Sequence, residues 1–235
     1  SAISRLQITS EAMDLMSTEI DGKQAAYRIE TDRLVIRCWT PEDAPLLRKA
    51  LDECDAHLRP YIPFMKDEPR TLEQTAQWLR GHRASFDTDQ LYRYAVFDAD
   101  EKTLLGENML LSRVGPGGLE IGYWTHKDAI GKGIASEASC AMIRVAFDIQ
   151  KMNRLEIMCA PENLASAAIP AKLGFSHEAT IKQRAYDSEG AVCDLMIWSL
   201  FAADYASSSA IKLAYKAYDC MGNLIIEETG KSSFN

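Results

Sequence analysis

The residues with the clearest chemistry in this chain form a short glycine turn, Gly131-Lys132-Gly133, followed by a segment with helical periodicity. Glycine has no side chain to block a ligand, and the first amides of a helix lack a carbonyl partner. The positive end of the helix dipole lies at the same place and favours an anion such as a diphosphate. A tight strand-to-helix connection would explain the two glycines equally well. The candidate anion-binding residues are Gly131, Lys132, Gly133, Ile134, Ala135 and Ser136.

The charge around this turn favours a small phosphorylated ligand. Between Trp124 and Arg154 the sequence has five basic and three acidic residues, whereas the whole chain has a net charge of −8. A nucleic-acid partner would usually require a broad basic face. We therefore expect a phosphorylated small molecule at the turn and no nucleic-acid partner.

Length and composition indicate one domain with extensions. The chain has 235 residues, 47% of them hydrophobic, which is enough for one sizeable core. No apolar run approaches the roughly 18 residues that cross a bilayer, and residues 1–30 lack a secretory-signal pattern. The six cysteines contain no C-x-x-C pair, which favours reduced thiols over disulfides or metal ligands. We expect a cytoplasmic protein with no membrane partner and no metal.

The pattern of apolar residues predicts which elements hold the glycine turn. Two helices separate a first strand from three strands joined by hairpin-like turns, and the third of these strands leads into the glycine turn. A helix, a strand, a second helix and two closing strands follow. The delimited strands are 34–39, 92–97, 104–112, 119–125 and 155–159; the helices run from Thr40 to about Cys54, from Thr71 to about Asp87, and onward from Gly133 and Asn163.

Five short motifs occur in a set order along the chain. They are Thr31-Asp32-Arg33-Leu34 with Ile36-Arg37, Glu120-Ile121-Gly122-Tyr123-Trp124, Gly131-Lys132-Gly133-Ile134-Ala135 with Glu137-Ala138, Asn163-Leu164-Ala165-Ser166, and Lys172-Leu173-Gly174-Phe175. Their order and spacing resemble the GNAT superfamily of acyl-CoA-dependent N-acetyltransferases, in the RimJ and RimL branch that acetylates ribosomal-protein N-termini. The resemblance covers residues 29–205. It implies a mixed α/β (α+β) fold with a central, mostly antiparallel sheet of about seven strands, flanked by helices and splayed at the acyl-CoA site.

The resemblance also implies how acyl-CoA is bound. In this family the CoA diphosphate lies on the glycine-loop amides, and the pantetheine arm pairs with the end of the preceding strand, here Trp124 and Thr125. Asn163 would hydrogen-bond the pantetheine arm, and Ser166 would face the thioester sulfur. Asn163 is also a good helix N-cap, which explains it about as well. The family often has Arg or Gln three residues before the first glycine, where this chain has Asp128.

Acetylation of an amine requires a neutral amine, a stabilised oxyanion and a proton for the departing thiolate. Glu120 is the candidate that would deprotonate or orient the ammonium, directly or through water; Glu107 and Glu156 are weaker candidates on neighbouring strands. Many relatives use a tyrosine as proton donor where this chain has Pro170, so Ser166 or water would take that role. Pro170 also removes the helical hydrogen bond to the Ser166 carbonyl, and the resulting kink either turns Ser166 toward the sulfur or is a tolerated irregularity.

The resulting functional prediction is an N-acetyltransferase that moves an acetyl group from acetyl-CoA to a primary amine by direct attack in a ternary complex. The acceptor is a peptide or protein N-terminus or a small cationic amine. A non-catalytic acyl-CoA-binding sensor or interaction module is the alternative, because the tyrosine is missing. A dinucleotide-binding oxidoreductase fits less well, since Ser136 replaces the third glycine and the preceding strands look antiparallel.

The extent of the resemblance divides the chain into three parts. They are an N-terminal extension (1–28), the acetyltransferase domain (29–205) and a C-terminal extension (206–235). Residues 206–209 look like a linker, and 211–226 contain apolar and aromatic side chains that prefer burial. We expect the C-terminal extension to form an added strand, or to contact a partner chain in a homodimer.

Overall fold

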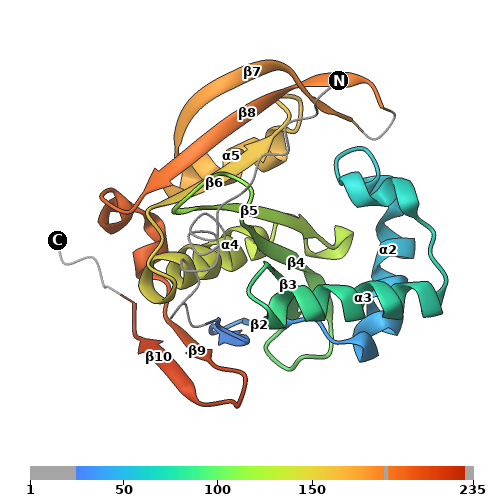
Figure 1. Ribbon diagram of the computed structural model, residues 1–235, viewed down its shortest axis with the longest axis horizontal. Helices are drawn as coiled ribbons and strands as arrows, with labels where there is room; N and C mark the ends of the chain where they lie inside the picture. The colour runs from blue at the N-terminus through green and yellow to red at the C-terminus, as the bar shows by residue number, and fades with distance from the viewer. Residues whose placement is uncertain (1–24, 188–189, 231–235) are drawn as a thin grey trace, which may run out of the picture.

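A computed structural model describes residues 25–187 and 190–230 (Figure 1). Most of the predicted N-terminal extension lies outside the described residues. Ten strands form one mixed sheet in the order β10-β9-β1-β2-β3-β4-β5-β6-β8-β7. The strands are β1 (Arg28–Glu30), β2 (Leu34–Cys38), β3 (Leu91–Asp98), β4 (Leu104–Leu111), β5 (Gly118–Thr125), β6 (Arg154–Cys159), β7 (Ser176–Tyr186), β8 (Val192–Phe201), β9 (Tyr215–Tyr218) and β10 (Leu224–Glu228).

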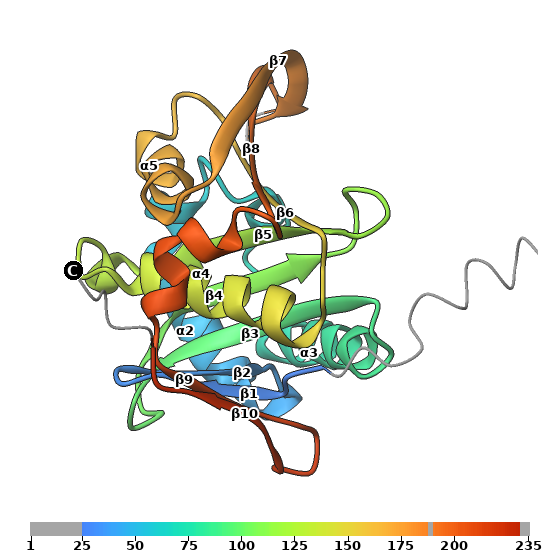
Figure 2. The same cartoon turned by 90° about the vertical axis from the view of Figure 1, so that its left-hand side faces the viewer.

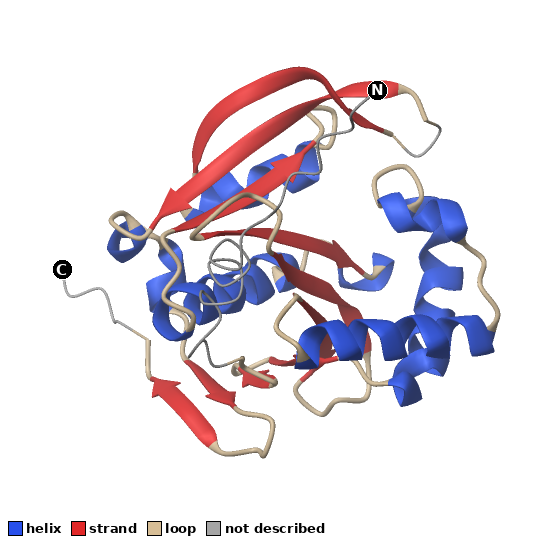
Figure 3. Ribbon diagram, in the orientation of Figure 1, coloured by secondary structure: helices blue, strands red, loops and turns tan. Residues whose placement is uncertain are grey.

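In the described part of the chain, four α-helices lie on both sides of this sheet (Figure 3). The helices are α2 (Ala44–Leu58), α3 (Leu72–Asp87), α4 (Ile134–Arg144) and α5 (Leu164–Leu173), with short helical turns η1 (Pro41–Asp43), η2 (Pro63–Asp67), η3 (Lys127–Ala129), η4 (Val145–Ile149), η5 (Tyr205–Ser207) and η6 (Ser209–Lys212). The order of elements predicted between residues 34 and 201 agrees with the structure. The first predicted helix continues past Cys54 to Leu58, because Leu58 is buried in the core beneath α2.

Two hydrophobic cores lie on opposite faces of the sheet. One includes residues of α4, and the other is formed largely by α2. Strand β3 serves both, because successive side chains of a strand point to opposite faces. Tyr94 and Val96 belong to the α4 core, while Ala95 and Phe97 belong to the α2 core. Figure 2 shows α4 and α5 on the same side of the sheet.

The sheet opens between β5 and β6, its parallel pair. Their register covers only three residue pairs, from Gly118 with Arg154 to Glu120 with Glu156. Within the described part of the chain, residues 121–125 of β5 have no register partner on β6. We call this opening the fork. It provides the splayed sheet that the sequence predicts.

The prediction of about seven strands is wrong by three. Strand β1 is only three residues long, and its pattern is too short to be read from sequence. Strand β9 pairs antiparallel with β1, matching Arg28 with Tyr218, and β10 pairs with β9 (Figure 2). These three strands widen the sheet at its β2 edge through a pairing between the two ends of the described chain.

None of the helices in residues 25–187 and 190–230 combines the length and apolar character needed to cross a membrane.

Candidate active site

The glycine loop joins η3 to α4 with an open face. Gly131 and Gly133 have φ angles of +74° and +78°, and Gly133 is the N-cap of α4. A Cβ at Gly131 would meet no atom within 4 Å. Among the described residues, the amides of Ile134, Ala135 and Ser136 have no hydrogen-bond acceptor, and the first bond of the helix runs from the Glu137 amide to the Gly133 carbonyl at 3.0 Å. These free donors and the open space fit a diphosphate.

The turn between β1 and β2 holds this loop from outside. The Nε and Nη2 atoms of Arg33 donate to one carboxylate oxygen of Glu137 at 2.7 and 2.5 Å, and Nη1 donates to the Lys132 carbonyl at 3.2 Å. The Thr31 hydroxyl donates to the other Glu137 oxygen at 2.6 Å. Arg33 thus offsets a negative charge in the first turn of α4, beside the anion site. The sequence motif contains Thr31 and Arg33 without indicating this contact.

The end of β5 offers backbone rather than side chains to a ligand. Trp124 is 3% exposed, and its indole donates to Glu107 at 2.8 Å on the α2 side of the sheet. Trp124 and Thr125 both lie beyond the residues of β5 that pair with β6. Only the main chain of Trp124 is therefore available to pair with an extended arm in the fork.

Asn163 and Ser166 come together at the start of α5. The Asn163 side-chain oxygen accepts from the Ser166 amide at 3.1 Å, so the structural explanation for Asn163 as an N-cap applies. Its side-chain nitrogen makes no hydrogen bond to any described residue, which leaves this donor for a ligand.

The side chain of Tyr123 extends from β5 to α5 and contacts Ser166. Its hydroxyl lies 3.1 Å from the Ser166 carbonyl oxygen and 3.2 Å from the Ser166 Oγ. Pro170 lies inside α5 and has no N–H for that carbonyl. The sequence predicted the freed carbonyl but missed Tyr123. Strand alternation could have identified it, because Tyr123 shares the α4 face of β5 with Ile121.

Glu120 lies at the base of the fork on the opposite face of β5 from Tyr123. It is 4% exposed, and Arg113 donates to its two oxygens at 2.5 and 2.7 Å. Arg113 comes from the loop between β4 and β5, and its side chain is 68% exposed. Glu120 can therefore act on an acceptor ammonium only if Arg113 moves away from it.

The two weaker carboxylate candidates, Glu107 and Glu156, already accept hydrogen bonds from other side chains. Glu107 is 3% exposed and accepts hydrogen bonds from Trp39, Trp124 and, twice, Arg93. Burial by itself raises the pKa of Glu107, but the charge of Arg93 and these hydrogen bonds outweigh it, so the pKa lies below its ordinary value. Glu156 is 8% exposed and accepts from Arg154 at 2.7 Å. The Glu107 contacts indicate a structural rather than a catalytic group.

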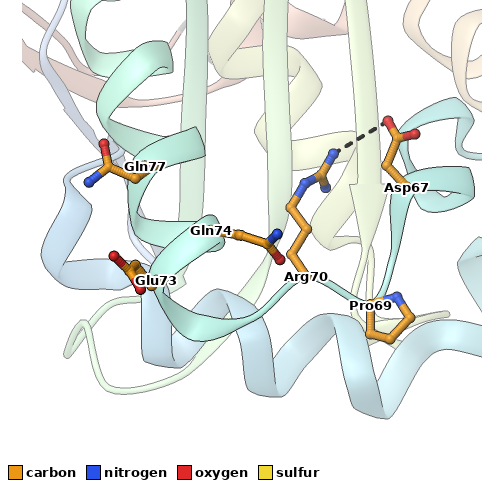
Figure 4. Close-up of a pocket in the computed structure, with 6 residues that line it drawn as sticks. All are labelled: Asp67, Pro69, Arg70, Glu73, Gln74 and Gln77. Carbon is orange, nitrogen blue, oxygen red and sulfur yellow. Dashed lines mark hydrogen bonds and ion pairs between the residues drawn. The ribbon is translucent and has the colours of Figure 1, made fainter.

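A separate open pocket of about 500 Å³ lies between η2 and the first turns of α3 (Figure 4). Its lining carries both signs of charge, with Arg70 3.4 Å from Asp67. No residue predicted to bind the cofactor or to act in catalysis lines it; the lining residues are Asp67, Pro69, Arg70, Glu73, Gln74 and Gln77. Nor do any three His, Cys, Asp or Glu residues in the described ranges form a group that could hold a metal ion.

The glycine loop and the fork are the arrangement expected of an acyl-CoA-dependent transferase, and the chain belongs to the GNAT family: residues 33–176 match the acetyltransferase (GNAT) domain. The [ribosomal protein uS5]-alanine N-acetyltransferase of Escherichia coli (strain K12) is 31% identical over 159 residues, covering 66% of this chain and 81% of that enzyme. YdaF of Bacillus subtilis (strain 168) is 27% identical over 181 residues, covering 74% and 94%.

Solved structures of acetyltransferases share the fold. The structure of RimL, a ribosomal L7/L12 α-N-protein acetyltransferase, in complex with coenzyme A superposes with a TM-score of 0.67 at 21% identity, covering 73% of this chain and 95% of that one. Family membership confirms the predicted activity: the chain is an enzyme that transfers an acetyl group to an amine. GNAT acetyltransferases use acetyl-CoA as the acetyl donor.

Proposed function

We propose that this enzyme transfers the acetyl group of acetyl-CoA to the α-amine of a peptide or protein N-terminus, through a ternary complex. The named activities of the Escherichia coli relative and of RimL support this acceptor class. The net charge of −8 would steer cationic acceptors toward the enzyme, small amines included. Ribosomal or other newly made proteins would meet the enzyme in the cytoplasm.

The observation that carries the proposal is the row of free amides at the start of α4 beside the fork. We assign the diphosphate to the amides from Gly131 to Ser136, where the helix dipole favours negative charge. The pantetheine arm would pair with the main chain of Trp124 and Thr125 along the open edge of β5. The free side-chain nitrogen of Asn163 would donate to it from α5.

We assign the chemical step to residues at the base of the fork. The acceptor ammonium displaces Arg113 from Glu120 and gives a proton to the carboxylate, directly or through water. The neutral amine then attacks the thioester carbon, forming the C–N bond, and its nitrogen, now positively charged, releases its second proton to water. As the C–S bond breaks, its electron pair moves to sulfur, and the Ser166 hydroxyl donates a hydrogen bond to the thiolate. Water supplies the proton that the thiolate finally takes.

Ligand binding and turnover test the proposal separately. A ligand at 100 times its dissociation constant adds about 2.7 kcal/mol to the free energy of unfolding, so acetyl-CoA should raise the melting temperature while NAD should not. Release of the CoA thiol would then be measured with a peptide carrying a free N-terminus, with its Nα-acetylated form as control and with spermidine. Turnover with spermidine alone would overturn the acceptor class, and binding without turnover would indicate a sensor.

A further inference from the structure

We propose that Tyr123 is a positioning residue for Ser166: its hydroxyl replaces the helical donor that Pro170 removes, and so directs the Ser166 hydroxyl for its contact with sulfur. This inference rests on the proposed function, and within it on the hydrogen bond from Ser166 to the departing thiolate. It gives a role to two features that an ordinary helix lacks: the proline inside α5, and the hydrogen bond from a strand residue to a carbonyl of the helix.

Counting protons fixes the direction of the two contacts. The Tyr123 hydroxyl has one proton and two neighbours, the Ser166 carbonyl oxygen at 3.1 Å and the Ser166 Oγ at 3.2 Å. The carbonyl can only accept, so Tyr123 donates to it and accepts from the Ser166 hydroxyl. The reverse assignment would leave the carbonyl without this donor, which costs free energy at a partly buried position.

This arrangement leaves Ser166 as a donor whose proton can change partner. Turning the hydroxyl hydrogen about the Cβ–Oγ bond moves it from Tyr123 to a sulfur in the fork, while the oxygen stays in place. The carbonyl contact holds the first turn of α5 at a fixed distance from β5 during this change. The hydrogen bond therefore forms as negative charge develops on sulfur, without a search among side-chain conformers.

The groups around Ser166 keep the cluster neutral. Burial raises the pKa of Tyr123, so its hydroxyl remains protonated and remains a donor. Burial likewise raises the pKa of the neighbouring Cys159 thiol. Neither neighbour brings a negative charge that would oppose the developing thiolate.

A double-mutant cycle between Tyr123→Phe and Ser166→Ala tests the proposal in the full chain. We expect each change to lower kcat about tenfold with the KM for acetyl-CoA within about twofold, and the double variant to lose little more than either single one, because residues in contact are not additive. Tyr218→Phe is the matched control, since its hydroxyl donates at 3.1 Å to Glu30 on the neighbouring strand β1, several strands away from the fork. Additive losses, or an unchanged kcat in Tyr123→Phe, would overturn the role of Tyr123.

Pro170→Ala separates positioning from simple support of the helix. Alanine returns an N–H to the Ser166 carbonyl but supplies no partner for the Ser166 hydroxyl. We expect Tyr123→Phe with Pro170→Ala to recover melting temperature but not kcat. Recovery of kcat would mean that Tyr123 only satisfies the carbonyl, and would overturn the proposal. The wild-type turnover assay is read first. An inactive wild type refutes the proposed function and the inference together. If the wild type is active, the variants test the role of Tyr123 separately from the proposed function.

Discussion

The two ends of the site are built from different parts of the chain. At the diphosphate end, the binding groups are backbone amides of one continuous loop, from Gly131 to Ser136. At the transfer end, the groups are side chains from separate elements, such as Tyr123 and Ser166, which are 43 residues apart. The end that is made of backbone amides is therefore determined by local sequence, whereas the end that is made of side chains depends on how distant segments pack.

The foundations of the two ends differ as well. Beneath β5 the Arg93–Glu107 pair is buried, with exposed side-chain fractions of 7% and 3%. At the glycine loop the Arg33–Glu137 pair is at the surface, where Arg33 is 53% exposed. Salt and solvent screen the second pair far more than the first.

Mild acid gives the largest expected effect, a loss of folding stability, because it protonates a histidine beside the buried Arg93–Glu107 pair. Burial first, and then the charge of Arg93, lowers the pKa of His82 to about 4 from 6.5. The unfolded chain therefore binds a proton that the folded chain rejects, and stability falls as pH drops from 6.5 toward 4, by about 3 kcal/mol in total. Urea unfolding against pH would measure this slope. His82→Asn should reduce it and the exposed His57→Asn should not; equal slopes in all three proteins would refute the assignment.

Loss of the carboxylate at the transfer end gives the next largest effect. We expect Glu120→Gln to lower kcat about 100-fold, a typical contribution of general acid–base catalysis, with little change in acetyl-CoA affinity. Steady-state kinetics with a peptide acceptor would measure it. Arg113→Ala is the paired variant: because it frees the carboxylate, kcat should be kept or raised. A matching loss of kcat in Arg113→Ala would show that the ion pair, rather than a free Glu120, is required.

A single methyl group at the diphosphate end should have an intermediate effect. Gly133→Ala places a Cβ on a left-handed residue, which costs roughly 1–2 kcal/mol, and should weaken acetyl-CoA binding about tenfold as the loop shifts. Calorimetry would measure the dissociation constant. Gly222→Ala carries the same backbone cost at φ +80° in the β9–β10 turn, and it should lose stability without losing affinity. Equal affinities in the two variants would contradict the assigned diphosphate site.

Loss of the Arg33–Glu137 ion pair at the glycine loop should give the smallest effect. Arg33→Ala leaves the Glu137 carboxylate with the Thr31 hydroxyl but without its ion-pair partner beside the anion site. We expect the KM for acetyl-CoA to rise about fivefold at low salt, in the range of a partly exposed ion pair. Adding Glu137→Gln should restore part of the loss by removing the repelling charge. If the second change worsens the KM instead, the ion pair acts through the position of the loop and not through charge.

The same comparison explains what the sequence could predict. The glycine loop, the N-cap at Asn163 and the carbonyl freed by Pro170 are local features, and each was readable from neighbouring residues. Three contacts could not be predicted because they join distant segments of the chain. The Arg33–Glu137 ion pair spans 104 residues, the Tyr123–Ser166 contact spans 43, and β9 pairs with β1. The number of strands was wrong because β1 is too short to be recognised from its pattern and because β9 joins the sheet only through β1. The proposed role of Glu120 stays a prediction, and its pairing with Arg113 could not be inferred from spacing alone.

The pairing of β9 with β1 affects where the chain can be cut. The region that matches the family model ends at residue 176, well before β9. A fragment ending at residue 205 would leave the outer edge of β1 unpaired and remove Tyr215 and Glu228 from the side of the buried Arg144, which stacks over the Tyr215 ring at 5.0 Å and lies 3.4 Å from Glu228. Unpaired strand edges invite aggregation. We therefore expect a fragment that ends at residue 205 to aggregate, whereas one that extends to residue 230 keeps β1 paired and stays soluble.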